Sequence, residues 1–70
     1  MQRTELNSTA LKSAAYCFQE AHLELELRSG AIYRFGGVPI ATYQELLRAE
    51  SKGVYFNRHI RNRFPHTKMS

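Results

Sequence analysis

The side chains with the clearest chemical potential are the cations near the C-terminal end of the sequence. Residues 52–70 contain five basic side chains and no acidic one. Arg58 and Arg61 are three residues apart and would share one face of a helix, with Arg63 to one side. Guanidinium groups bind phosphate through paired hydrogen bonds, and Tyr55 near this face could stack on an unpaired base. The pattern predicts an RNA-contacting surface; the alternative is a solvated helix face whose arginines pair weakly with nearby glutamates.

Residues 51–53 form a second candidate site for an anion. Ser51 is a suitable N-cap, and the free N–H groups of a helix N-terminus suit a phosphate. Lys52 in the first turn opposes the helix dipole unless an anion binds there. Gly53 would let a ligand approach the backbone closely. The alternative is an ordinary N-cap, an exposed lysine and a glycine required for packing, and the sequence favours it because the spacing of a P-loop is absent.

The remaining reactive side chains form no pattern typical of catalysis. Cys17 and the histidines His22, His59 and His66 could supply a nucleophile and a base. A strand cysteine, however, is most often a small core residue, and these four side chains lack the spacing of a zinc site. The chain contains no aspartate. We therefore predict that the protein is not an enzyme and uses no metal and no cofactor.

Length and composition define the class of protein. Seventy residues, 43% hydrophobic and 23% charged, allow one small folded domain. A single cysteine excludes an intrachain disulfide and fits a reducing compartment. The N-terminus shows no apolar leader, and no apolar run approaches the ~18–20 residues that span a bilayer. We expect a cytoplasmic protein with no membrane partner, and a monomer is favoured.

The elements that position these side chains begin with a predicted hairpin. Residues 22–28 alternate polar residues and leucines, which is typical of a strand with one buried face. A two-residue turn before the returning strand would place Arg34 on the leucine face. A three-residue turn instead pairs Glu24 with Arg34 on the open face, and we predict this turn, with Gly30 in the left-handed conformation. The predicted open face carries His22, Glu24, Glu26, Arg28, Ile32 and Arg34.

Two helices are predicted after the hairpin, over residues 39–49 and 52–64. Pro39 suits the first turn of the first helix, and Pro65 would end the second. With a strand over residues 11–18, the order is β-β-β-α-α, an α+β fold in which two helices pack on one face of a three-stranded antiparallel sheet. We expect one domain over residues 10–66, a flexible lead-in over 1–9 and a flexible tail over 67–70. The predicted core is Leu23, Leu25, Leu27, Tyr33, Phe35, Leu46, Leu47, Phe56 and Ile60.

Several of these segments together carry a family resemblance. They are Leu23-Glu-Leu-Glu-Leu-Arg-Ser-Gly, Tyr33-x-Phe35, Val38-Pro39-x-x-x-Tyr43 and Ser51-Lys52-Gly53-x-Tyr55-Phe56-Asn57-x-x-Ile60-Arg61. Over about residues 9–66 the sequence resembles the KTSC domain, a module named from a C-terminal extension of some lysyl-tRNA synthetases and also found as a stand-alone bacterial protein. The family's central Tyr-x-Tyr is Tyr33-Arg34-Phe35 here, so a role of the second hydroxyl does not carry over. The resemblance implies RNA binding through the synthetase association.

Two functions from different classes follow. The first is a non-catalytic module that binds RNA, with tRNA as a candidate, through phosphates. Its contacts would be Lys52, Arg58, Arg61, Arg63 and Tyr55, with Ser51 and Gly53 at the helix N-terminus. The alternative is a small protein-interaction or accessory module that uses the open sheet face or an exposed edge strand. The charge asymmetry favours the first.

Overall fold

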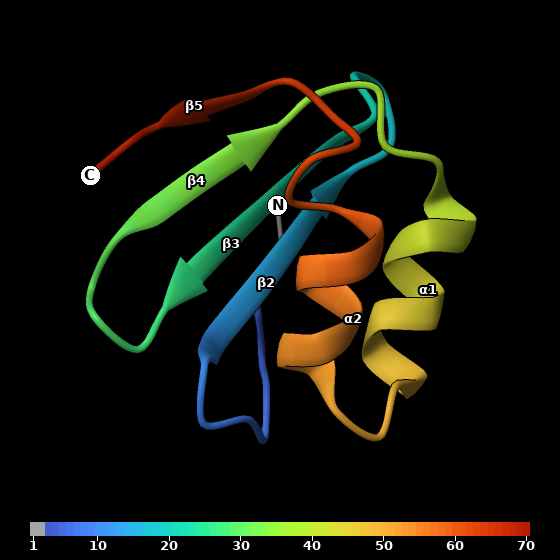
Figure 1. The fold of residues 1–70 in the computed structure, drawn as a ribbon. Helices are drawn as coiled ribbons and strands as arrows, with labels where there is room; N and C mark the ends of the chain where they lie inside the picture. The colour runs from blue at the N-terminus through green and yellow to red at the C-terminus, as the bar shows by residue number, and fades with distance from the viewer. Residues whose placement is uncertain (1–2) are drawn as a thin grey trace.

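The leucine alternation over residues 22–27 forms the central strand of an antiparallel sheet in the computed structural model, which describes residues 3–70. The strands follow one another in the sheet in the same order as in the chain, and two helices lie on one side of them (Figure 1). The strands are β1 (Arg3–Glu5), β2 (Leu11–Cys17), β3 (His22–Leu27), β4 (Ile32–Phe35) and β5 (His66–Lys68). The helices are α1 (Ile40–Arg48) and α2 (Lys52–His59).

The predicted α+β class is confirmed, but the sheet has five strands rather than three. The additional strands, β1 and β5, form the two edges of the sheet and lie in segments that we expected to be a lead-in and, for the most part, a tail. Both are three residues long and exposed throughout, so neither shows the alternation that marks a half-buried strand. Backbone pairing holds them, with Thr4 opposite Ala14 and Thr67 opposite Arg34.

The predicted hairpin register is confirmed. Leu25 lies opposite Tyr33 and Glu24 opposite Arg34. The Leu27 N–H donates to the Ala31 carbonyl at 2.8 Å, which closes the three-residue turn. Gly30 has a φ of +99°, the left-handed conformation that the turn requires.

The second helix is shorter than predicted. It ends at His59, because Ile60 leaves the helical conformation with a φ of −122°. The N–H groups of Ile60 and Arg61 both donate to the Phe56 carbonyl, so the chain turns there. The Gly36 N–H then donates to the Pro65 carbonyl at 3.0 Å, which fixes the chain beside β4 and leads it into β5. The turn at Ile60, which directs the chain back to the sheet, therefore ends α2 at His59, well before Pro65.

The core lies between the sheet and the helices. Six of the nine predicted core residues are buried, whereas Leu27, Tyr33 and Leu47 are only partly buried. Leu27 and Tyr33 both line a hollow at the surface, which explains their partial exposure. In Figure 1, β4 and β5 extend beyond α1 and α2. Among residues 3–70, no helix is long and apolar enough to cross a lipid bilayer. The additional buried apolar residues are Leu6, Leu11, Ala14, Ala15 and Val38.

Candidate nucleic-acid interface

The predicted arginines lie at the end of α2 and in the turn that follows it. Arg58 is exposed in the last turn of the helix, and Arg61 and Arg63 are exposed beyond its end. Arg61 Nη1 donates to Asn57 Oδ1 at 3.3 Å, so a neutral side chain orients this guanidinium. The three cations therefore line a short helix end and turn, rather than one face of a long helix.

The charge environment of these arginines differs from that of the cations on the sheet. On the sheet, Arg3 and Arg34 both pair with Glu24. Across residues 3–70, no ion pair joins Arg58, Arg61 or Arg63 to a carboxylate. Their positive charge is thus available to an external anion.

The residues at the start of α2 have structural roles. The Ser51 hydroxyl accepts a hydrogen bond from the Val54 N–H at 3.3 Å, which caps the helix. Lys52 Nζ donates to the Ala49 carbonyl at the end of α1, at 2.9 Å. A Cβ on Gly53 would lie 3.2 Å from the Cβ of Ala10, so glycine permits close packing at this position. These contacts support the structural explanation of the three residues. The neutral Ala49 carbonyl orients the Lys52 ammonium group and leaves its charge unpaired, as Asn57 does for Arg61.

Tyr55 is half-buried and turned towards α1. Its ring centroid lies 4.6 Å from that of His59. Burial, and then the negative charge of Glu45 on α1, raise the pKa of Tyr55 above its ordinary value of 10.0. Tyr55 is therefore only partly available for stacking on an external base.

A groove that the sequence did not predict lies beside Arg61, between β4, β5 and the end of α2. Its volume is about 390 Å³. Tyr33 is a predicted core residue and His66 is the last residue of the predicted domain, and both line this groove. The one signal in the sequence was the closeness of Arg61, Asn62 and His66 along the chain. The lining residues are Leu27, Tyr33, Phe35, Phe56, Arg61, Asn62 and His66.

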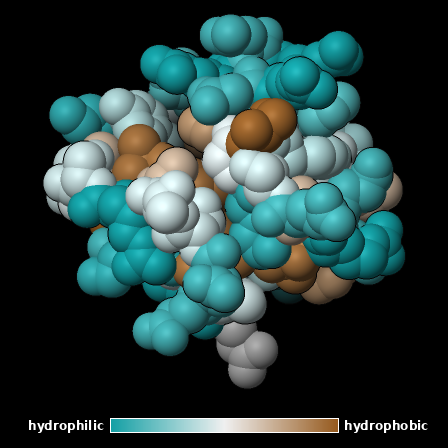
Figure 2. All heavy atoms as spheres, turned by 60° about the horizontal axis from the view of Figure 1, so that its bottom comes forward, coloured by the Kyte–Doolittle hydropathy of each residue, from teal (hydrophilic) through white to brown (hydrophobic). Residues whose placement is uncertain are grey.

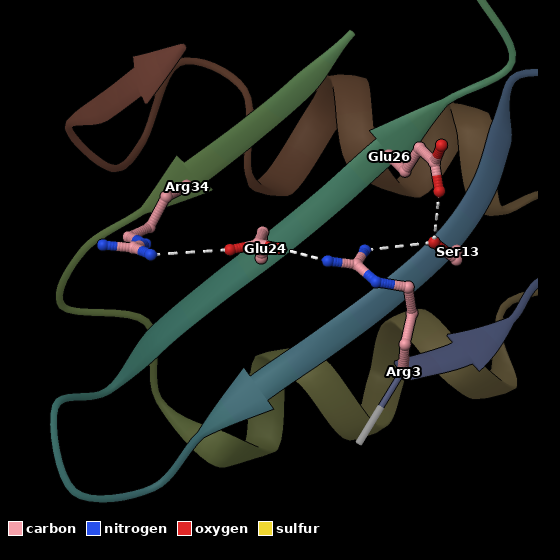
Figure 3. Close-up of polar contacts among 5 residues, drawn as sticks. All are labelled: Arg3, Ser13, Glu24, Glu26 and Arg34. Atoms are coloured by element: carbon pink, nitrogen blue, oxygen red, sulfur yellow. Dashed lines mark hydrogen bonds and ion pairs between the residues drawn. The ribbon is translucent and has the colours of Figure 1, made fainter. Parts of the chain in front are cut away.

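The open face of the sheet, predicted as the rival surface, carries a chain of polar contacts across four strands (Figure 3). Glu24 lies at its centre, with Arg3 on one side and Arg34 Nη2 at 3.6 Å on the other. Arg3 also donates to the Ser13 hydroxyl at 3.1 Å, and that hydroxyl donates to Glu26 Oε1 at 3.0 Å. The charges on this face largely satisfy one another, which leaves few free groups for a partner.

Three aromatic rings, separate from those that line the groove, lie near the C-terminal end of β2. Phe18 is 76% exposed and packs edge-on against Tyr16, which stacks on Tyr43 with ring centroids 5.3 Å apart. These three rings and Thr4 line a shallow hollow of about 330 Å³ that contains no charged side chain. Figure 2 shows one face of the molecule as mainly hydrophilic, with small separate hydrophobic patches.

Cys17 is a free thiol at the end of β2, opposite His22. Glu20 Oε1 lies 3.3 Å from His22 Nδ1. No hydrogen bond between Cys17 and His22 occurs in the described part of the chain, which runs from residue 3 to residue 70. Within the same range, no three metal-ligating side chains gather into a cluster.

Comparison with known proteins decides the family. Residues 7–64 match the model of the KTSC domain. The chain belongs to the KTSC domain family. The matched segment of this KTSC domain begins after β1 and ends before β5, so the two edge strands lie outside it.

Individual relatives agree with this assignment. An uncharacterized protein of Stutzerimonas stutzeri is 43% identical over 58 residues, which cover 83% of this chain and 82% of that protein. A lysine–tRNA ligase of Nostoc sp. is 42% identical over 48 residues, which cover 69% of this KTSC domain but only 9% of the ligase. The crystal structure of a KTSC domain protein from Yersinia pestis matches with a TM-score of 0.95 at 30% identity, covering 99% of this chain and 97% of that one.

Proposed function

We propose that this KTSC domain is a non-catalytic RNA-binding module that contacts phosphates through Arg58, Arg61 and Arg63. The observation that carries the proposal is the charge environment of these side chains. All three are exposed, and within residues 3–70 none pairs with a carboxylate. On the sheet, by contrast, Arg3, Lys12 and Arg34 each pair with a glutamate. Unpaired guanidinium groups on one surface suit a polyanion.

Among polyanions, RNA is favoured because a relative of this domain is part of an enzyme named for its action on tRNA. A segment of the Nostoc sp. lysine–tRNA ligase is similar to most of this domain. A module attached to an enzyme that handles tRNA would add affinity through tethering, even when its own affinity is weak. The proposal places the protein in the cytoplasm, in contact with tRNA or with a similar folded RNA.

The test is a titration of the purified protein with a tRNA and with a single-stranded RNA, repeated over a range of salt concentrations. Three phosphate contacts predict a log–log slope of about −2 on single-stranded RNA, since each contact contributes about −0.7. Lys52 keeps its charge beside the Ala49 carbonyl, so a contact from it as well would make the slope about −3. We expect a dissociation constant that is micromolar or weaker at physiological salt.

A matched pair of variants locates the contact. Arg58→Glu combined with Arg63→Glu should abolish the salt-dependent binding. Arg48→Glu is the control, because Arg48, like Arg58, is an exposed cation in the last turn of a helix. Absence of RNA binding at low salt would contradict the proposal and favour the alternative, a protein-interaction module using the open sheet face or an edge strand. Equal loss in both variants would place the contact elsewhere.

A further inference from the structure

We propose that the groove beside Arg61 holds one unpaired nucleobase of the bound RNA. The inference rests on the proposed function for the nature of its ligand, and it adds a base-binding site to the phosphate contacts. The groove lies between β4, β5 and the end of α2, on the face of the sheet that carries the helices. In Figure 1, β4 and β5 extend beyond α2 on this face.

Four aromatic rings line the groove, of which His66 is exposed and Tyr33 is partly exposed. Phe35 and Phe56 are buried and form its floor, with ring centroids 5.7 Å apart. Tyr33 and His66 also line the groove and pack edge-on, with ring centroids 5.6 Å apart. His66 is exposed, and its ring also lies 5.3 Å from that of Phe35. Bases of any kind stack on aromatic faces, so these rings suit a nucleobase without requiring one sequence.

The rim of the groove supplies polar groups that match the rest of a nucleotide. Arg61 and Asn62 are exposed lining residues, and Asn57 orients the Arg61 guanidinium. A guanidinium binds the phosphate next to the base, while an amide both donates and accepts hydrogen bonds at a base edge. Lys68 lies opposite Tyr33 across the β4–β5 pair and adds a second cation on the same face. No carboxylate lines the groove.

The size of the groove and the contrast with the other aromatic hollow support this ligand. A volume of about 390 Å³ lies at the lower end of the range of small-molecule sites, which runs from about 300 to 1,000 Å³, so the groove fits one base rather than a stack. The hollow around Phe18 is also aromatic, but no cation lines it. Of these two hollows in residues 3–70, the groove is the one that combines aromatic walls with a positive rim.

The first test uses mononucleotides on the isotope-labelled protein. We expect adenosine 5′-monophosphate to shift the amide resonances of Tyr33, Asn62 and His66 in a saturable manner, and ribose 5-phosphate at the same concentration to leave them nearly unchanged. The difference between the two probes measures the contribution of the base. Equal shifts from both probes would show a phosphate site only and would overturn the inference, as would the absence of any shift in the groove with every nucleoside monophosphate.

The second test uses matched aromatic variants in the RNA titration. His66→Ala should weaken binding by roughly fivefold or more, which is the size expected for loss of one stacking partner. His66→Phe should restore most of the affinity. Phe18→Ala is the control, because it removes an exposed ring outside the groove. Equal affinity of the His66→Ala and Phe18→Ala variants would overturn the inference.

The failures of the two proposals can be told apart. RNA binding that depends on Arg58 and Arg63 but is indifferent to His66, with no nucleotide shifts in the groove, would overturn the base site and keep the proposed function. Nucleotide shifts in the groove without RNA binding at low salt would keep the base site and overturn the proposed function. Should the His66→Ala protein fail to fold, the mononucleotide test on the unaltered protein still decides.

Discussion

At the scale of single residues, a substitution of Gly53 can test whether this glycine at the start of α2 is needed for packing or for ligand binding. A Cβ at this position would lie 3.2 Å from the Cβ of Ala10, so a larger side chain must push the β1–β2 loop away. We expect Gly53→Val to lower the free energy of unfolding by roughly 1–3 kcal/mol in urea denaturation. Ala41→Val, at an exposed site of α1, is the control and should change it by less than about 0.5 kcal/mol. A Gly53→Val protein of normal stability that fails to bind RNA would contradict the packing role.

Tyr55 gives a prediction about pH. Burial and the charge of Glu45 raise the pKa of the Tyr55 phenol in the folded protein. The folded state therefore holds this proton more tightly than the unfolded state does, and its stabilising effect, complete below pH 10, is lost as the pH rises through the raised pKa. We expect Tyr55→Phe to flatten the fall in stability at alkaline pH, measured by thermal unfolding. Spectrophotometric titration should show one tyrosine fewer in the late, high-pH phase; an unchanged curve would contradict this assignment.

At the scale of elements, the part of the fold that the sequence predicted is the part with a periodic buried face. Leu23, Leu25 and Leu27 alternate with charged residues, and the Glu24–Arg34 pair distinguished between two turn lengths. The edge strands were missed because their residues are exposed on both faces, so only backbone pairing defines them. Such pairing depends on where a distant segment returns, which no local pattern shows.

The candidate site likewise has a part that the sequence predicted, the arginines, and a part that it did not, the groove. Helical spacing predicted Arg58 as an exposed side chain of α2. Arg61 is also exposed, but it lies beyond the end of the helix and lines the groove, which helical spacing did not predict. The groove was not predictable, because periodicity shows which face of a helix is buried but not how far the helix extends across the sheet. Tyr33 and Phe35 share one face of β4, and only the incomplete cover by α2 makes one of them half-exposed.

The contacts of Glu24 join three strands, of which β1 and β3 are not neighbours in the sheet. Arg3 of β1 and Arg34 of β4 both pair with this carboxylate of β3, whose side chain is 13% exposed (Figure 3). We expect Glu24→Gln to lower the free energy of unfolding by about 1–2 kcal/mol, because two partly covered guanidinium groups lose their counter-charge. Glu50→Gln, at an exposed position outside this network, is the control for urea denaturation. Equal stability of the two variants would mean that the network is only a surface feature.

At the scale of the whole molecule, stability is uneven between the two edges and the centre. The strand β5 joins the sheet only after the long connection over residues 36–65, and its three residues are exposed. Opening it therefore exposes little apolar surface. We expect the Met69 amide, bonded to the Ile32 carbonyl at 2.7 Å, to exchange with solvent deuterium much faster than the Leu25 amide at the sheet centre. Similar protection of the two amides would show that the sheet opens as one unit.

The order of the strands also affects how the chain reaches its native state. Each strand pairs with the strands before and after it in the chain, so most pairings form between segments that are already close. Proteins dominated by local contacts fold quickly, since little loop-closure entropy is lost before the first contacts form. The meander of β1 to β4 can assemble as it is synthesised, and α1 and α2 then cover its leucines. A unit of this kind can be appended to the end of a much longer polypeptide and acquire its structure without waiting for, or disturbing, the folding of its host.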